Sequence, residues 1–289
     1  MLLAVAGTSA YRRVLGLDTT DPAALLRATD GHPPSEPVLV LAPQHLAQLA
    51  AEQAHVHLAA DPRARVAVLP LAHHALTLAL IAEAVHEQLS GPGPRDPSDA
   101  VRLVHRLAAR SRSLVWYPRL WRLAEPAVGI GQALRAMIGP GGYYRELGGP
   151  AAVHPGKGAC PFTAADTVHH LAPAPAPLAD QLGGAQAVPV ELDVEPAPYW
   201  ARTTVELTVL AAATVPAADG TRCDSCAASR VDGVCPFCGH GPMNLAESTL
   251  PKAASRESDR ADADHPALAV SALVGSHAGA PEPSEGDAA

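Results

Sequence analysis

The chain has 289 residues, of which 48% are hydrophobic, and its formal net charge at pH 7 is −8. This length gives room for one or two domains with a sizeable core, and the negative charge disfavours nonspecific binding of the whole molecule to DNA or to anionic membranes. No uncharged apolar run approaches the roughly 18 residues of a transmembrane helix, and the first residues lack the basic start of a signal peptide. We therefore expect a cytoplasmic protein.

Residues 1–90 alternate between short apolar runs and longer segments with helical composition. The predicted strands are apolar throughout, which is typical of parallel strands that are covered on both faces of their sheet. The sequence therefore predicts an α/β fold, with a small Rossmann-like parallel sheet over 1–90. The expected strands are Leu2–Ala6, Pro37–Leu41 and Arg65–Leu69, and the expected helices are Ala23–Ala28, Pro43–Ala60 and His73–Leu89.

The carboxyl ends of these strands are the place where such sheets bind ligands. No Gly-x-Gly-x-x-Gly pattern follows the first strand, so the sequence carries no dinucleotide-binding fingerprint. For the candidate residues at these strand ends, the simpler interpretation as ordinary loop and helix-capping groups is favoured over a pocket. The candidate pocket residues are Gly7, Thr8, His45, His73 and His74.

A basic stretch follows, in which residues 95–145 hold nine Lys and Arg against three Asp and Glu. We expect 95–170 to form a helical region that contains aromatic residues and packs on the α/β unit, beginning with a helix over Asp96–Arg112. Arginines interleaved with aromatics could bind a protein partner, a membrane surface or nucleic acid. The alternative is a solvated arginine face backed by tryptophans in the core. The candidate contact residues are Arg102, Arg106, Arg110, Trp116 and Trp121.

Differences in composition divide the remainder of the chain into three segments. Prolines punctuate 171–200, which predicts a semi-rigid linker, and the alternating pattern of Arg202–Leu210 predicts a strand within a segment at 201–244. Residues 245–289 are rich in Ala, Ser, Pro and acid, which predicts a disordered acidic tail. A second metal site is conceivable, although its spacing fits no established pattern; its residues would be His154, Cys160, His169 and His170.

The most specific pattern is a pair of Cys-x-x-Cys turns that holds four of the five cysteines. Two such turns can close a tetrahedron of thiolates around Zn²⁺, with Zn–S distances of about 2.3 Å. Rubredoxin-like iron and disulfide or redox chemistry are the alternatives, and His240 is expected to be a spectator. The expected metal ligands are Cys223, Cys226, Cys235 and Cys238.

This pattern resembles a zinc ribbon over residues 221–242, a module appended to many bacterial proteins. Ala227 stands where a glycine would ease the first turn, and Asp232-Gly233 is a strong reversal signal between the two turns. The resemblance implies structural Zn²⁺ with no open position for catalysis.

We found no catalytic constellation in the sequence. The functional expectation is therefore a non-catalytic, zinc-stabilised adaptor protein with a protein partner. The alternatives are an enzyme with a pocket at the strand ends of 1–90, and nucleic-acid binding through 95–145.

Overall fold

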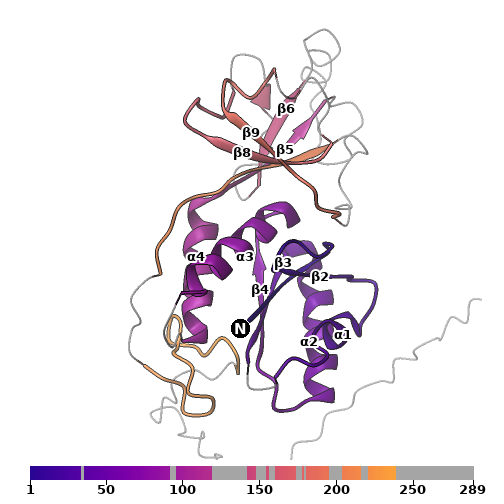
Figure 1. Ribbon diagram of the computed structural model, residues 1–289, viewed down its shortest axis with the longest axis vertical. Helices are drawn as coiled ribbons and strands as arrows, with labels where there is room; N and C mark the ends of the chain where they lie inside the picture. The colour runs from indigo at the N-terminus through magenta and orange to yellow at the C-terminus, as the bar shows by residue number, and fades with distance from the viewer. Residues whose placement is uncertain are drawn as a thin grey trace, which may run out of the picture. The chain divides into compact units, whose positions relative to one another are not determined.

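The computed structural model describes residues 1–33, 36–91, 96–118, 142–147, 154–155, 160–173, 178, 180–194, 204–215 and 221–238. Its first sheet has the order β2-β1-β3-β4, and all of its strands run parallel (Figure 1). The strands are β1 (Leu2–Ala6), β2 (Leu15–Leu17), β3 (Val38–Pro43) and β4 (Val66–Leu71). The predicted Rossmann-like parallel sheet is confirmed, although the three-residue β2 was too short to be recognised.

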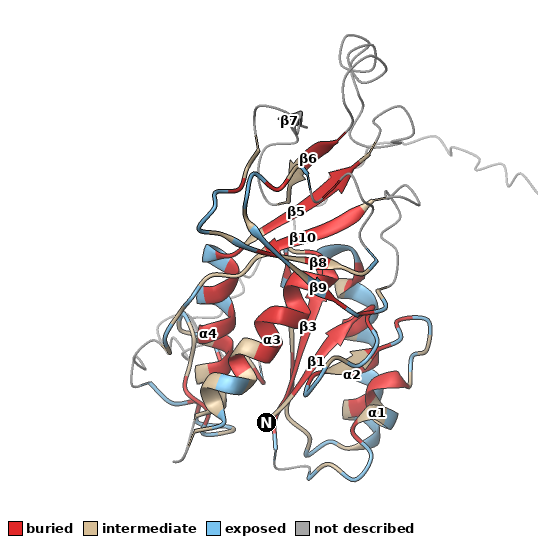
Figure 2. Cartoon of the chain, turned by 45° about the horizontal axis from the view of Figure 1, so that its top comes forward, coloured by how far each residue is buried: buried red, intermediate tan, exposed pale blue. Residues whose placement is uncertain are grey.

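Helices cover both faces of this sheet because alternate strand residues point to opposite sides. Leu3 and Leu39 pack with α3 (Ala75–Leu89) and α4 (Pro97–Arg110). Ala4 and Val40 pack on the other face, with α1 (Ala24–Ala28) and α2 (Ala47–Ala60), which follows the short 3₁₀ helix η1 (Gln44–Leu46). Figure 2 shows the resulting burial of the strands between their helices. This explains the continuous apolar runs in the sequence.

The chain after α4 corrects our expectation for 95–170. Only α4 is helical among its described residues, and strands of a second sheet follow, in the order β7-β6-β5-β10-β8-β9. These strands are β5 (Arg112–Tyr117), β6 (Tyr143–Glu146), β7 (His154–Pro155), β8 (Thr167–Leu171), β9 (Gln186–Val190) and β10 (Val205–Val209). The pairings are antiparallel except for β8 with β9. Trp116 and Tyr117 are fully buried, because β5 carries the aromatic and β-branched residues that pack well in a sheet.

The segment expected to be a linker also contains structure. Residues 186–190 form β9, which lies at the edge of the second sheet, where a proline is tolerated because one side of the strand needs no donor. The strand expected within Arg202–Leu210 appears as β10, between β5 and β8. The predicted tail at 245–289 lies outside the described residues.

Helix α4 shows how the sequence sets an element boundary. The Asp96 carboxylate accepts a hydrogen bond from the Ser98 N–H, and Pro97 occupies the first turn, where its missing N–H costs nothing. Val101, Val104 and Leu107 form the buried face, as the spacing predicts. Among the described residues, no helix is both long and apolar enough to cross a membrane.

Candidate functional site

A groove of about 290 Å³ lies at the carboxyl end of β1. Gly7 has a φ of 74°, a conformation that glycine adopts without strain, and it turns the chain out of the strand toward the second sheet. Gly16 lies opposite, and a Cβ at that position would come within 2.2 Å of the Thr8 carbonyl oxygen. The groove is lined by Gly7, Thr8, Ser9, Leu17, Asp18, Thr20, Asp193 and Val194.

Residues from the two sheets meet at this groove through backbone hydrogen bonds. The Ser9 N–H donates to the Asp193 carbonyl at 2.8 Å, and the Asp193 N–H donates to the Ser9 hydroxyl oxygen at 3.1 Å. On the opposite rim, the Gln53 amide of α2 donates to the Asp18 carbonyl at 2.6 Å. These contacts fix the backbone of both acidic residues at the rim.

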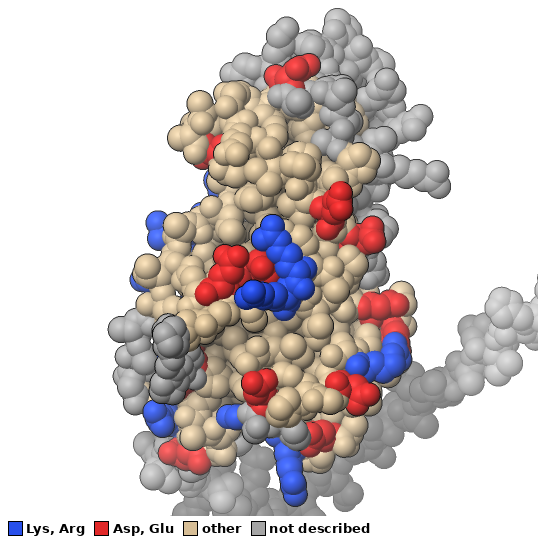
Figure 3. All heavy atoms as spheres, in the orientation of Figure 1, with Lys and Arg blue, Asp and Glu red and all other residues tan. Residues whose placement is uncertain are grey.

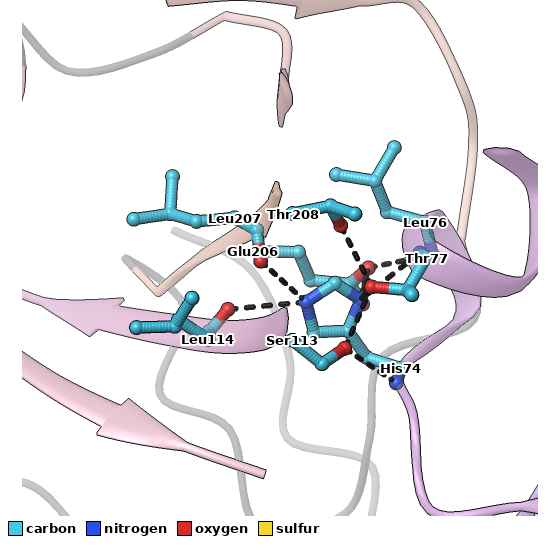
Figure 4. Close-up of polar contacts among 8 residues, drawn as sticks. All are labelled: His74, Leu76, Thr77, Ser113, Leu114, Glu206, Leu207 and Thr208. Atoms are coloured by element: carbon cyan, nitrogen blue, oxygen red, sulfur yellow. Dashed lines mark hydrogen bonds and ion pairs between the residues drawn. The ribbon is translucent and has the colours of Figure 1, made fainter. Parts of the chain in front are cut away.

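A buried polar junction connects α3 to the second sheet (Figure 4). The Nε2 atom of His74 lies 3.1 Å from the carbonyl oxygens of Leu114 and Leu207. Carbonyls only accept, so Nε2 must carry a proton. The Nδ1 atom lies 2.9 Å from an oxygen of Glu206, and these two atoms would both be acceptors unless one is protonated. Nδ1 and the Glu206 carboxyl group therefore form a close pair in the interior, and Nδ1 also accepts from the Thr77 N–H at 3.2 Å.

The rest of the junction is also hydrogen-bonded. The Leu76 N–H, at the beginning of α3, donates to the Glu206 carboxylate at 2.8 Å. The Thr77 hydroxyl lies 2.6 Å from that of Ser113 and 2.7 Å from that of Thr208. His74 and Glu206 have side-chain exposures of only 1% each. The positive N-terminal end of α3 thus receives a carboxylate from the protein itself.

The structure brings together only part of the predicted pocket. Gly7 and Thr8 line the groove, whereas His45 is exposed at the start of the α2 region. Nε2 of His73 lies 2.9 Å from the Ala108 carbonyl near the end of α4, and burial holds the pKa of His73 below its usual value. His74 belongs to the buried junction and not to the groove.

Several residues of these sites were missed in the sequence. Asp18, Thr20 and Asp193 follow short or unrecognised strands, so nothing in the sequence connected them with Gly7. Glu206 did carry a signal, since it is a charged residue within the apolar alternation of β10. A charge at such a position indicates a buried partner.

The four cysteines of the paired turns do come together. Their sulfur atoms all lie within 4.8 Å of one another, with Sγ–Sγ distances of 3.3 Å for Cys223 with Cys238 and for Cys226 with Cys235. Backbone hydrogen bonds from Ser225 and Cys226 lower the pKa of the Cys223 thiol, and burial raises that of Cys226. This arrangement is compatible with a metal ion held by four sulfurs.

The backbone of the cysteine turns confirms the expected strain. Ala227 has a φ of 60°, which is costly for a residue with a Cβ. Asp232 and Gly233 have φ values of 50° and 80°, the pattern of a tight reversal. Gly239 and His240 lie outside the described residues.

The cysteine turns pack against α4. Cys223, Cys235 and Phe237 join the apolar cluster that includes Val101 and Val104. The Ser229 hydroxyl donates to the Asp96 carboxylate at 2.7 Å, so the residue that caps α4 also anchors the cysteine turns.

Two of the three proposed partner-binding arginines make contacts within the chain. Arg102 pairs with Asp99 at 2.6 Å, and Arg106 donates to the Thr214 carbonyl at 3.1 Å. Trp116 is fully buried because β5 lies within the second sheet, and Trp121 lies outside the described residues. Arg110 is exposed at the last turn of α4. On the face shown in Figure 3, acidic side chains lie beside basic ones, with no basic stripe.

The possible second metal site does not form among the described side chains. Only the four clustered cysteines there lie close enough to share an ion. Cys160 instead donates to the Gln181 carbonyl at 3.1 Å, and His169 and His170 lie on β8. The His154 side chain lies outside the described part of the chain.

Comparisons with known proteins identify the fold. No family model matches the sequence, and no curated protein matches it either. A DegV family protein from Eubacterium eligens, solved loaded with heptadecanoic acid, aligns with a TM-score of 0.54 and 12% identity, over 73% of this chain and 99% of its own. The DegV family protein Cg2579 from Corynebacterium glutamicum aligns with a TM-score of 0.50 and 12% identity, over 74% of this chain and 98% of its own.

These likenesses show that the chain has the α/β fold of DegV proteins, and they overturn the adaptor prediction. That prediction based the function on the cysteine turns. The shared fold instead spans nearly the full length of both neighbours, and one of them was solved with a fatty acid. The nucleic-acid alternative loses its basis as well, because Arg102 and Arg106 are bonded and Trp116 is buried.

Proposed function

We propose that this protein binds a long-chain lipid without transforming it, at the groove where the two sheets meet. The observation that carries this proposal is the shared fold, which covers 99% of a protein loaded with heptadecanoic acid. The groove lies beyond the carboxyl end of β1, where open parallel sheets bind their ligands.

An apolar cluster adjoins the groove, and we propose it as the route for the acyl chain. Val194 lines the groove and also packs on a cluster formed by α3 and β9 residues, among them Leu76, Leu80 and Val190. The groove volume of about 290 Å³ is just below the range of ligand pockets, which span roughly 300–1,000 Å³. We therefore expect the head group to lie in the groove and the acyl chain to enter by displacing side chains of this cluster.

The test is displacement of the uncharged fluorescent probe N-phenyl-1-naphthylamine from the full chain by single-chain lipids. Val194→Asp places a charge on the apolar route and should abolish binding. Val56→Asp is the matched control, because Val56 is 37% exposed on α2 and lies outside the groove. Equal binding by both variants would contradict the proposed route, and no binding by the wild type would contradict the function.

Separately, we propose that the clustered cysteines hold one structural Zn²⁺. Four thiolates satisfy its tetrahedral preference and leave no position for substrate. Elemental analysis should find one zinc per chain, lost when Cys235 and Cys238 are both replaced by serine. Iron, or no metal together with two disulfides, would contradict this assignment.

A further inference from the structure

The hydroxyl groups of the groove offer few protons to a ligand. The Thr8 hydroxyl donates to the Val5 carbonyl at 3.2 Å, and the Thr20 hydroxyl donates to the Asp18 carboxylate at 2.6 Å. The Ser9 hydroxyl accepts from the Asp193 N–H and keeps its own proton. Each hydroxyl has a single proton, so the groove has spare lone pairs and only one free hydroxyl donor among these three side chains.

Two backbone donors of the groove, those of Gly7 and Ser9, are also in use. The Gly7 N–H donates to the Leu17 carbonyl at 2.8 Å, and the Ser9 N–H donates to the Asp193 carbonyl. A ligand carboxylate has only acceptor oxygens and needs donors of this kind. These N–H groups are therefore not available to it.

The charges at the groove also disfavour a ligand carboxylate. Asp18 and Asp193 both line it, and none of the described lining residues is basic. Hydrogen bonds from the Thr20 hydroxyl and N–H lower the pKa of Asp18, so this carboxylate is ionised at neutral pH. A ligand carboxylate would meet two like charges there.

At the beginning of α3, two N–H groups that could receive a ligand carboxylate are already in use. The Leu76 N–H already donates to Glu206, and the Thr77 N–H faces Nδ1 of His74 at 3.2 Å. Both acceptors are buried and come from the protein itself. A ligand carboxylate at this position would have to take the place of the buried Glu206 carboxyl group.

We propose that the groove selects a lipid whose head group donates hydrogen bonds, such as a hydroxyl, amide or ammonium, over one that ends in a carboxylate. Asp18 and Asp193 are the specificity-determining residues. This inference rests on the proposed lipid binding and names the class of lipid.

The experiment compares dodecylamine, dodecanol and dodecanoate, each below its micelle concentration, as displacers of N-phenyl-1-naphthylamine from the full chain at neutral pH. The three probes share one chain and differ only in the head group. Dodecanol and dodecylamine should bind roughly five- to tenfold more tightly than dodecanoate, since exposed charges contribute modestly. Dodecanol tests hydrogen bonding alone, because it is uncharged. The additional affinity of dodecylamine over dodecanol measures attraction between charges.

The variant is Asp18→Asn with Asp193→Asn, which keeps the side-chain shape and adds amide donors. Its affinity for dodecanoate should exceed that of the wild type by roughly five- to tenfold, and it should no longer prefer dodecylamine over dodecanoate. The matched control, Glu52→Gln, removes an exposed charge on α2 away from the groove and should change nothing.

The outcomes separate the two proposals. If no probe binds, the proposed lipid binding fails. If dodecanoate binds most tightly to the wild type, or if the double variant leaves the order unchanged, lipid binding stands and the head-group inference is overturned.

Discussion

Glu206 is the residue on which the junction between α3 and the second sheet depends most. It lies on β10 and reaches both the His74 ring and the Leu76 N–H, more than a hundred residues away in sequence. Removing one member of a buried ionisable pair leaves the other without compensation in a medium of low dielectric. Loss of the junction should therefore lower the free energy of unfolding of the whole fold.

We predict that Glu206→Ala lowers the free energy of unfolding by about 3–5 kcal/mol, the range for breaking a buried pair. Urea denaturation followed by circular dichroism measures this change. The control is Glu191→Ala, since Glu191 is exposed and its loss should stay within about 0.5 kcal/mol. A similar small effect for Glu206→Ala would show that the junction does not stabilise the fold.

The residues of the junction can be picked out in the sequence, but their contact with one another cannot. Adjacent histidines at the start of a predicted helix and a glutamate inside a predicted strand are each visible, but their contact depends on β10 pairing with β5 in one register. That register brings Leu207 opposite Leu114, which places both carbonyls at His74. Long-range strand pairing leaves no local trace in the sequence.

At the scale of elements, α4 and the cysteine turns form one structural unit. Cys223 and Cys235 belong to the same apolar cluster as Val101 and Val104, so a metal that orders the turns also covers this face of the helix. Metal binding and folding of such turns are a single equilibrium.

We predict that removing the proposed Zn²⁺ with a chelator increases amide hydrogen exchange over α4 and not over α2. Hydrogen exchange read by mass spectrometry compares the peptides that cover the two helices, with α2 as the internal control because it packs on the opposite face of the first sheet. Unchanged protection of α4 would mean that the turns do not support the helix.

Asp96 should make this unit sensitive to acid. Burial acts to raise its pKa, but hydrogen bonds from Ser229 and Ser98 outweigh this, so its pKa in the folded protein is below the unfolded value of about 3.9. Its stabilisation is therefore complete above the unfolded pKa and is lost as the pH falls through the folded pKa.

We predict that the wild type loses stability between about pH 5 and pH 3 more steeply than Asp96→Asn, whose side chain does not titrate in this range. Urea unfolding at several pH values measures both proteins, and the difference cancels protonation of the cysteines, which they share. Parallel curves would contradict the role of the Asp96 carboxylate.

The elements were predictable to different degrees for physical reasons. The first sheet is parallel and covered on both faces, so its strands are apolar throughout and stand out. The second sheet has mostly antiparallel strands separated by long connections, and Pro189 on the edge strand β9 indicated a linker instead. The cysteine cluster was predictable because two short-range turns determine its ligand set.

At the scale of the whole molecule, two polar contacts among the described residues connect the first α/β unit with the second sheet. One is the buried junction of His74 with Glu206, and the other is the groove where Ser9 meets Asp193. The groove could not be predicted in full, because Gly7 and Thr8 come from the first sheet while Asp193 and Val194 follow the unrecognised β9.

The central claim is that the chain binds a long-chain lipid at this groove. Native mass spectrometry of the purified full chain tests it most directly, with the bound molecule identified after extraction. We predict one lipid per chain, absent from Val194→Asp and retained by Val56→Asp. A wild-type chain that carries no lipid, and takes up none when single-chain lipids are supplied, would contradict the account.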